Sequence, residues 1–292
     1  MFIATLIAAE TLDGEAIEAA GRRLADRGCD PEAPRWIDEG KAADIFFASA
    51  PEEARGALEG VFAGVDIVVQ PAEGREKKLL VADMDSTMIT VECIDELADY
   101  AGIKAQIAAV TEAAMRGELD FGAALDARVA LLKGLEEAVI DRCLAERVTI
   151  MAGAKALVRT MRARGAETIL VSGGFTRFAE PVAREIGFDR AIANVLELAG
   201  GALAGTVAKP IVDSTTKERT LLEARDRLGL AAHETLAVGD GANDLAMIRL
   251  AGLGVAYHAK PVVAAAAGAR IDRNDLTALL YAQGIARRDW AE

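Results

Sequence analysis

The chain has few of the residues that build zinc sites, disulfide frameworks or histidine-based catalytic centres. Its 292 residues include three cysteines, Cys29, Cys93 and Cys143, which are far apart and form no CxxC pair. This spacing indicates neither a zinc site nor a disulfide framework, and it fits a reducing cytoplasm. The two histidines, His233 and His258, do not stand in an HExxH or triad-like pattern. Acid–base chemistry is therefore expected from carboxylates.

Aromatic residues, positive charge and long apolar runs are also scarce. Aromatics make up 4% of the chain and hydrophobic residues 52%, which favours helices packed on a parallel sheet over an aromatic-rich β-sandwich. The formal net charge of -13 argues against nucleic-acid binding, which needs clustered Lys and Arg. No window approaches the roughly 18 apolar residues of a membrane span, and the N-terminus lacks the basic flank of a signal peptide. We expect a cytoplasmic protein that binds neither nucleic acid nor membrane.

Residues 1–73 have the pattern of a small α+β domain. Apolar runs and amphipathic stretches follow one another in the order strand, helix, strand, strand, helix, strand. This order is typical of a ferredoxin-like unit, which buries one face of its sheet under two helices. The charged segment 72–79 is a plausible linker, and we place the domain boundary near Pro71.

Residues 78–292 alternate apolar runs with helical stretches. The runs LLVAD, TILVSGG, TLAVGDG and GLGVAY predict a doubly wound, Rossmann-like parallel sheet, which binds ligands at the carboxyl ends of its strands. Roughly 80 residues separate the first run from the second, far more than one crossover helix needs. The excess, residues 91–149, is rich in Ala, Leu, Glu and Arg. It predicts a helical cap that could exclude water from a site below it.

The first strand ends on two carboxylates in the sequence DMDST. Residues i and i+2 of a strand point to the same side, so Asp83 and Asp85 would share one small space. A divalent cation such as Mg²⁺ would relieve that crowding, because it is held by carboxylates, water and phosphate oxygens. The alternative is a strand that ends in an ordinary polar turn, since Asp, Ser and Thr are common turn residues.

Two further strands end in polar motifs. Ser172, Gly173 and Gly174 offer a hydroxyl and unhindered NH groups suited to phosphate, although most such turns are only tight connections. The GDGAND motif adds Asp240, Asn243 and Asp244 within a single short turn. These side chains could complete an oxygen-rich metal site, or they could cap a helix and form an Asx turn.

Lys217 opens a predicted helix between these two motifs, with Ser and Thr neighbours that resemble a cap. A lysine close to clustered carboxylates can neutralise them and hold a phosphoryl group. A solvated helix lysine is the alternative.

The four motifs DxDST, SGG, Lys and GDGxND, in this order at strand ends, resemble the haloacid dehalogenase-like phosphohydrolases. The resemblance runs from about Lys78 to the C-terminus. DMDSTMITVECIDELA, RVALLKGL, VSGGF and VGDGANDLAM together resemble the branch of that family that converts O-phosphoserine to serine and phosphate, the last step of serine biosynthesis. The N-terminal unit is similar in pattern to the ACT-like domains that precede some bacterial members.

The resemblance implies a Mg²⁺-dependent phosphomonoester hydrolase with assigned residues. Asp83 would be the nucleophile that forms an aspartyl-phosphate, and Asp85 the general acid and base. The implied binding residues are Asp83, the Asp85 backbone carbonyl and Asp240 for Mg²⁺, Ser172, the Gly173 NH and Lys217 for the phosphoryl group, Asn243 for the phosphoryl group or water, and Asp244 for orienting the metal shell or Lys217.

For the substrate, the resemblance implies that Glu92 faces the amino group and Arg128 the carboxylate of phosphoserine, since an Arg fork suits a carboxylate. Without the family pattern, Glu92 and Arg128 would be interpreted as solvated charged residues on helices. Met115 is either an apolar wall of the cap or a core residue.

Other functions remain open at this point. A phosphotransferase or phosphatase acting on another small alcohol, such as phosphohomoserine, would keep the same catalytic residues. A phospho-signalling receiver would lack the helical insert and the GDGxND motif, and a degenerate serine-binding protein would lack some catalytic residue types. The choice between Mg²⁺ and Mn²⁺, and whether the chain forms a homodimer, also stay open.

Overall fold

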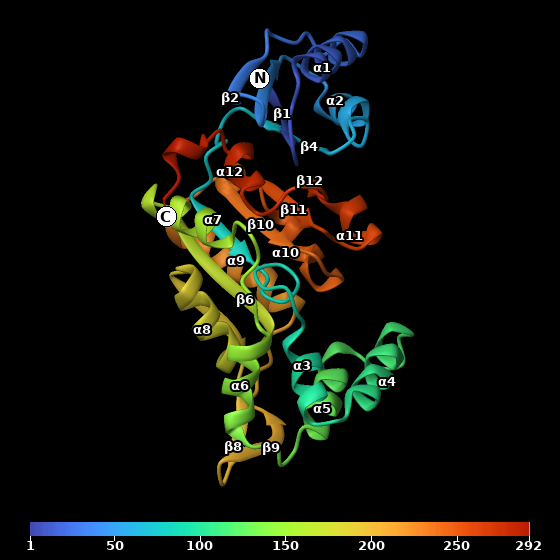
Figure 1. The fold of residues 1–292 in the computed structure, drawn as a ribbon, viewed down its shortest axis with the longest axis vertical. Helices are drawn as coiled ribbons and strands as arrows, with labels where there is room; N and C mark the ends of the chain where they lie inside the picture. Colours follow the sequence, from blue (N-terminus) through green and yellow to red (C-terminus); the bar gives the residue numbers. More distant parts are fainter. Residues whose placement is uncertain (292) are drawn as a thin grey trace.

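The computed structural model describes residues 1–291, except for the side chain of Met115, so the role expected for Met115 lies outside the described part. Three layers of the molecule are visible in Figure 1: a small domain at one end, a central sheet with helices, and a helical region at the other end. No helix within residues 1–291 is both long and apolar enough to span a bilayer.

The N-terminal domain is a four-stranded antiparallel sheet with two helices on one face. The sheet has the order β2-β3-β1-β4, which is the ferredoxin-like arrangement expected from the sequence. Side chains of β1 alternate between the two faces, so Leu6 packs under the helices and Ile7 packs on the catalytic core. The elements are β1 Phe2–Ala8, α1 Gly14–Asp26, β2 Arg35–Asp38, β3 Ala42–Phe47, α2 Pro51–Leu58 and β4 Val65–Pro71.

The central sheet has six parallel strands in the order β12-β11-β10-β5-β6-β7. The first strand, β5, is central, and the chain winds to one side and then to the other, so the strand order reverses between β5 and β10. Ligand sites of such sheets lie at this reversal. The strands are β5 Leu79–Ala82, β6 Glu167–Phe175, β7 Arg190–Asn194, β10 Thr235–Gly239, β11 Leu253–Tyr257 and β12 Ala269–Ile271.

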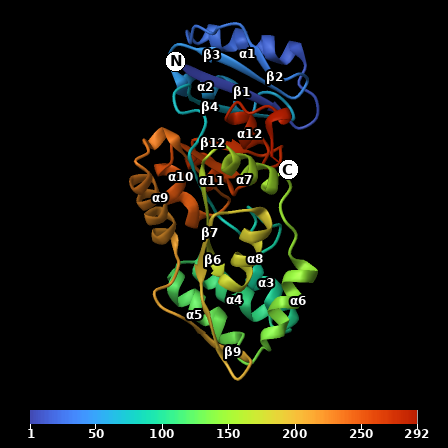
Figure 2. The same ribbon diagram turned by 90° about the vertical axis from the view of Figure 1, so that its left-hand side faces the viewer.

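Helices cover both faces of this sheet, which explains why its strands are continuous apolar runs. Leu80 of β5 belongs to the core under α7 and α8, while Leu79 and Val81 belong to the core under α9 to α11. Figure 2 shows the sheet between these two layers. The helices are α7 Ala154–Ala163, α8 Thr176–Ile186, α9 Ser214–Leu228, α10 Leu245–Leu250, α11 Pro261–Ala266 and α12 Ala278–Ala282, with short 3-10 turns η1 Ala232–Glu234, η2 Ala242–Asp244 and η3 Arg287–Asp289.

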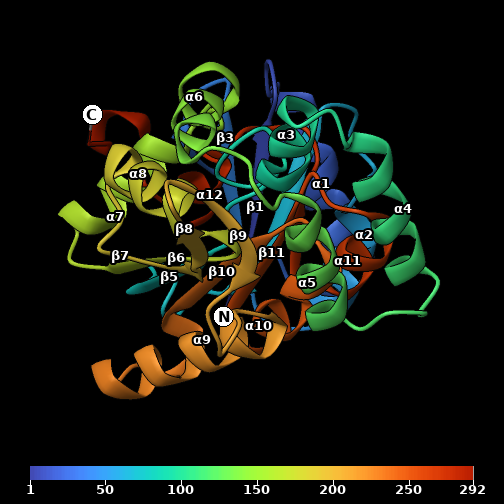
Figure 3. The same ribbon diagram turned by 90° about the horizontal axis from the view of Figure 1, so that it is seen from below.

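The insert between β5 and β6 is helical, as the sequence predicts. Its entry and exit segments are bridged, because Thr90 N donates to Thr149 O at 3.0 Å and Met151 N donates to Met88 O at 2.9 Å. Figures 1 and 3 show α3, α4 and α5 on one side of the β8–β9 hairpin. The sequence did not predict β7, β8, β9 or β12. These elements are α3 Cys93–Tyr100, α4 Lys104–Met115, α5 Phe121–Leu131, α6 Glu137–Arg147, β8 Leu196–Ala199 and β9 Ala202–Val207.

Arg75 joins the N-terminal domain to the catalytic unit. Its guanidinium donates to Asp44 Oδ2 at 2.6 Å and to Asp44 Oδ1 at 2.7 Å, while its Nε donates to Ala282 O at 2.9 Å. Thr5 Oγ1 donates to Asp44 Oδ1 at 2.8 Å. Segment 72–79, expected to be a linker, is therefore partly built into the interface. The domain limits of 1–73 and 78–292 stay a prediction.

Candidate active site

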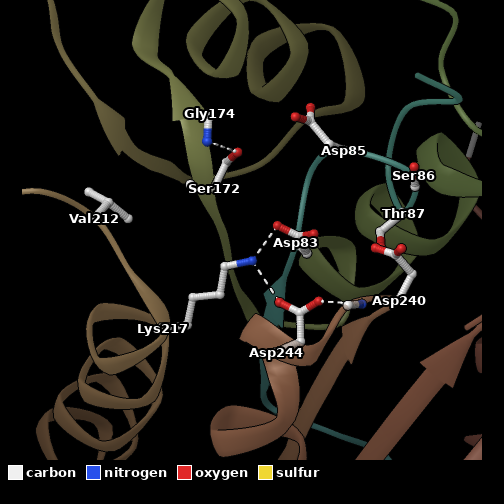
Figure 4. Close-up of polar contacts among 12 residues, drawn as sticks. Asp83, Asp85, Ser86, Thr87, Ser172, Gly174, Val212, Lys217, Asp240 and Asp244 are labelled. Atoms are coloured by element: carbon white, nitrogen blue, oxygen red, sulfur yellow. Dashed lines mark hydrogen bonds and ion pairs between the residues drawn. The ribbon is translucent and has the colours of Figure 1, made fainter. Parts of the chain in front are cut away.

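Asp83 and Lys217 form the centre of the site, at the end of β5. The Lys217 side chain is 1% exposed and Asp83 is 5% exposed. Lys217 Nζ donates to Asp83 Oδ1 and, at 2.6 Å, to Asp244 Oδ1 (Figure 4). Burial disfavours the charged ammonium, but Asp83 and Asp244 outweigh it and raise the pKa of Lys217. Lys217 is thus a permanently charged group between two carboxylates.

Three carboxylates crowd beside this lysine. Ligand oxygens of Asp83, Asp240 and Asp244 all lie within 4.8 Å of one another. Burial, and then the charge of Asp83, raise the pKa of Asp240 and Asp244. One lysine cannot balance three acids, and carboxylate oxygens are the donors that Mg²⁺ prefers. The donor set therefore fits a hard divalent cation.

The turn after β10 requires glycine to bring Asp244 into this cluster. A Cβ on Gly239 would stand 2.4 Å from Asp244 Cγ, so no other residue fits there. The Gly241 NH donates to Asp244 Oδ2 at 3.0 Å. Thr87 Oγ1 donates to Asp240 Oδ1 at 3.3 Å and so orients the Asp240 carboxylate. Sequence reasoning did not single out Thr87, although it is the last residue of the DMDST motif.

The Asp85 side chain points away from the acidic cluster (Figure 4). Its Oδ2 accepts a hydrogen bond from Cys93 N at 3.4 Å, while its buried Oδ1 has no partner among residues 1–291. Burial, followed by the charges of Glu92 and Asp83, raises the pKa of Asp85 well above its usual value. A carboxyl group in this environment favours the protonated form and can donate a proton.

The opposite wall of the site is the end of β6. Ser172 is buried, and its Oγ accepts a hydrogen bond from Gly174 N at 2.9 Å. A Cβ on Gly173 would stand 3.2 Å from Phe121 Cζ, so the first residue of α5 in the insert lies directly over this turn. The turn Ser172–Gly174, expected from the sequence to bind phosphate, is therefore covered by α5 of the insert.

Asn194, which sequence reasoning missed, connects this wall to the loop before α9. Its side chain is buried, and Nδ2 donates to Gly173 O at 2.8 Å and to Val212 O at 3.2 Å. Its Oδ1 accepts from Val212 N at 2.7 Å. One amide therefore fixes two loops, and a lone Asn at a strand end gives no sequence signal of this role.

The helix that carries Lys217 is capped by Asp213, not by the Ser and Thr residues that follow. Asp213 Oδ1 accepts from Thr216 N at 2.9 Å and from Thr216 Oγ1 at 3.1 Å. The cap sets the start of α9 at Ser214 and so places Lys217 on its first turn, facing the carboxylates.

Glu92 and Arg128 lie on the insert side of the site. Glu92 precedes α3, and its Oε1 accepts a hydrogen bond from Ser86 Oγ at 2.7 Å. Partial desolvation, and the charges of Asp240 and Asp83, raise the pKa of Glu92, while the Ser86 bond opposes them. Burial lowers the pKa of Arg128, against the effect of the nearby acids. An acid and a base thus lie close enough to interact electrostatically at the insert side of the site.

Asn243 lies on η2, partly exposed, with its amide folded over the preceding turn. A Cβ on Gly241 would stand 2.3 Å from Asn243 Oδ1. The structure brings the DMDST, SGG, Lys217 and GDGAND residues to one edge of the sheet. The individual roles expected for them stay predictions.

Comparisons with known proteins agree with this geometry. A family model for haloacid dehalogenase-like hydrolases matches residues 77–252. The chain is 40% identical over 285 residues to a phosphoserine phosphatase of Streptomyces coelicolor, covering 95% of this chain and 69% of that protein. It is 44% identical over 225 residues to a phosphoserine phosphatase of Mycobacterium tuberculosis, covering 76% of this chain and 55% of that protein. The chain thus spans just over half the length of the Mycobacterium relative.

Solved structures are similar as well. A hydrolase of the haloacid dehalogenase family from Salmonella enterica serovar Typhi aligns with a TM-score of 0.84 and 30% identity, covering 96% of this chain and 98% of that one. A structure of the phospho-aspartyl intermediate analogue of a phosphoserine phosphatase aligns with a TM-score of 0.65 and 35% identity, covering 70% of this chain and 98% of that one. The first similarity includes the N-terminal domain.

Proposed function

The chain belongs to the haloacid dehalogenase-like hydrolase family as a phosphatase, and from that membership we propose that it hydrolyses O-phosphoserine to serine and phosphate. The observation that carries the proposal is the pairing of a buried Asp83 and Lys217 with an acid and a base, Glu92 and Arg128, on the insert side of the same site. The names of the relatives support it. The cytoplasmic location and the place in serine biosynthesis expected from the sequence belong to this proposal.

In the first step, an Asp83 carboxylate oxygen attacks phosphorus and the bond from phosphorus to the serine oxygen breaks. Asp85, whose pKa is raised by burial, donates its proton to the leaving serine oxygen. In the second step, water attacks the aspartyl-phosphate and Asp85 accepts a proton from that water. The bond from phosphorus to Asp83 breaks, which releases phosphate and restores both carboxyl groups.

The phosphoryl group would lie between Lys217 and the end of β6. Lys217 supplies a fixed positive charge, and the Ser172 hydroxyl and Gly173 NH supply hydrogen-bond donors. Asn194 bonds the backbones of Gly173 and Val212 and so fixes both loops. The Ser172 hydroxyl and the Gly173 NH are therefore ordered before the substrate binds.

The acidic cluster would hold Mg²⁺ through Asp83, Asp240 and, from the family pattern, the Asp85 backbone carbonyl. When bound, the ion neutralises charge on the phosphoryl oxygens. Asp244 would serve differently, because it shares Lys217 with Asp83 and orients that ammonium.

The substrate amino and carboxylate groups would face the insert. Glu92 offers a carboxylate to the ammonium, and Arg128 offers a guanidinium to the carboxylate. Since Glu92 directly precedes α3 and Arg128 lies on α5, closure of the insert would assemble the specificity residues over the catalytic ones.

The test is phosphate release from O-phosphoserine against a panel of small phosphomonoesters, with Mg²⁺ and with EDTA. We expect a strong preference for O-phosphoserine that EDTA abolishes. The Asp83→Asn variant should keep the fold by circular dichroism and lose turnover. Metal-dependent activity confined to other esters would remove the assigned substrate, and full activity of Asp83→Asn would remove the covalent mechanism.

A further inference from the structure

Ser86 adopts a backbone conformation that is unfavourable for its residue type. Its φ is +55°, in the left-handed region that residues with a Cβ rarely enter. It is one of four non-glycine residues with positive φ within residues 1–291. The loop is closed by three NH groups that converge on the Met84 carbonyl, from Thr87 at 3.3 Å, Met88 at 2.8 Å and Ile89 at 3.0 Å. A strained residue beside a nucleophile points to a functional role for its side chain.

The turn sends the Ser86 side chain toward the insert instead of the acidic cluster. Ser86 Oγ donates to Glu92 Oε1 at 2.7 Å, and Figure 4 shows Ser86 on the far side of Asp85 from Lys217. The second oxygen, Glu92 Oε2, has no hydrogen-bond partner among the described residues. One oxygen of the carboxylate is therefore held by the catalytic loop, while the other is free for a ligand.

We propose that Ser86 is a positioning residue that selects the substrate ammonium by fixing Glu92. The inference deepens the proposed function and rests on it. Glu92 is exposed and follows the segment that links the core to the insert, so its long side chain would otherwise sample several rotamers. The Ser86 hydroxyl removes that freedom before binding, which lowers the entropic cost of ordering the carboxylate around an ammonium.

Ser86 acts on one half of the substrate only. Its hydroxyl makes no hydrogen bond with Asp83, Lys217 or Asp240 in the described chain. Loss of the hydroxyl should therefore weaken recognition of the ammonium and leave the attack on phosphorus unchanged. The typical net contribution of one intramolecular hydrogen bond corresponds to a change of about five- to tenfold in KM.

The test compares two substrates in four proteins: the wild type, Ser86→Ala, Glu92→Ala and the double variant. The substrates are O-phosphoserine and 3-phosphooxypropanoate, which keeps the phosphate and carboxylate but lacks the amino group. For Ser86→Ala we expect a KM for O-phosphoserine raised about five- to tenfold, with kcat and the KM for 3-phosphooxypropanoate unchanged. In the Glu92→Ala background, Ser86→Ala should have no further effect, because the acceptor of its hydrogen bond is gone.

Ser86→Gly keeps the proposal testable if the alanine variant unfolds, because glycine removes the same hydroxyl and relieves the positive φ. It should reproduce the KM pattern of Ser86→Ala with unchanged or raised stability. Equal losses on both substrates, a loss confined to kcat, or a Ser86→Ala effect that persists with Glu92→Ala would overturn the inference alone. A wild type that releases no phosphate from O-phosphoserine would overturn the proposed function and, with it, the inference.

Discussion

Lys217 is the cation that the buried carboxylates of Asp83 and Asp244 share, so its removal should destabilise the protein in a way that depends on pH. The perturbation is Lys217→Met, which keeps the length of the apolar stem and deletes the ammonium. In the wild type, that ammonium contacts Asp83 and Asp244, whose side chains are 7% and 0% exposed. The methionine variant would leave both carboxylates buried without their shared counter-charge.

The magnitude follows from the separation of the charges. Removing one partner of a buried ion pair costs about 3–5 kcal/mol. Two carboxylate charges at the outer limit of the cluster, 4.8 Å apart, repel by about 3 kcal/mol at an effective dielectric constant of about 20. We therefore expect the free energy of unfolding of Lys217→Met to fall by about 3–5 kcal/mol at neutral pH.

The sign of the pH dependence can be stated in advance. Without the lysine, the folded-state pKa values of Asp240 and Asp244 lie further above the unfolded value of about 4 than in the wild type. The folded variant then binds more protons than the unfolded chain, so its stability falls as pH rises above about 4 and through the raised pKa values. The deficit relative to the wild type should be smaller at pH 5 than at pH 8.

The assay is urea unfolding of the metal-free protein at pH 5, 6.5 and 8, repeated with millimolar Mg²⁺ at pH 8. Added Mg²⁺ should recover part of the loss, because a cation that binds only the folded state stabilises it. Lys104→Met is the matched control, since Lys104 is exposed and makes no ion pair within the described chain. A Lys217→Met variant as stable as the wild type at pH 8, or a deficit equal at all three pH values, would refute the reasoning.

Three further changes test other parts of the structure. Arg128→Ala should raise KM for O-phosphoserine about 10- to 100-fold, through loss of a charged hydrogen-bond pair, and should spare phosphoethanolamine, which has no carboxylate; equal losses on both would argue against its role. Asn194→Ala leaves buried backbone groups unpaired, so it should cost about 2–3 kcal/mol in urea unfolding and lower kcat; an unchanged kcat would contradict the loop-fixing role. Arg75→Ala strands Asp44 in the domain interface and should cost about 3–5 kcal/mol by calorimetry, and adding Asp44→Asn should recover part of that loss; no recovery would count against an electrostatic origin.

The sequence by itself determined four strands of the central sheet and the polar residues at their ends. Leu79, Leu80 and Val81 are buried on both faces of the sheet, and a buried parallel strand must be a continuous apolar run. The carboxyl ends of such strands meet at one edge, so motifs placed there meet as well. Asp83 and Lys217 could therefore be assigned to one site although 134 positions separate them.

The tertiary structure alone decided the contacts that give these residues their geometry. The bonds from Asn194 to Gly173 and Val212, and from Arg75 to Asp44, join single polar residues across long stretches of chain. Such contacts leave no periodic pattern, because each depends on which backbone atoms the packed elements bring within hydrogen-bond distance. The sequence of the polar segment around Arg75 therefore resembles that of a solvated linker. Only the packing of the N-terminal domain on the rest of the chain places the Arg75 guanidinium between Asp44 and the Ala282 carbonyl, where it is partly buried.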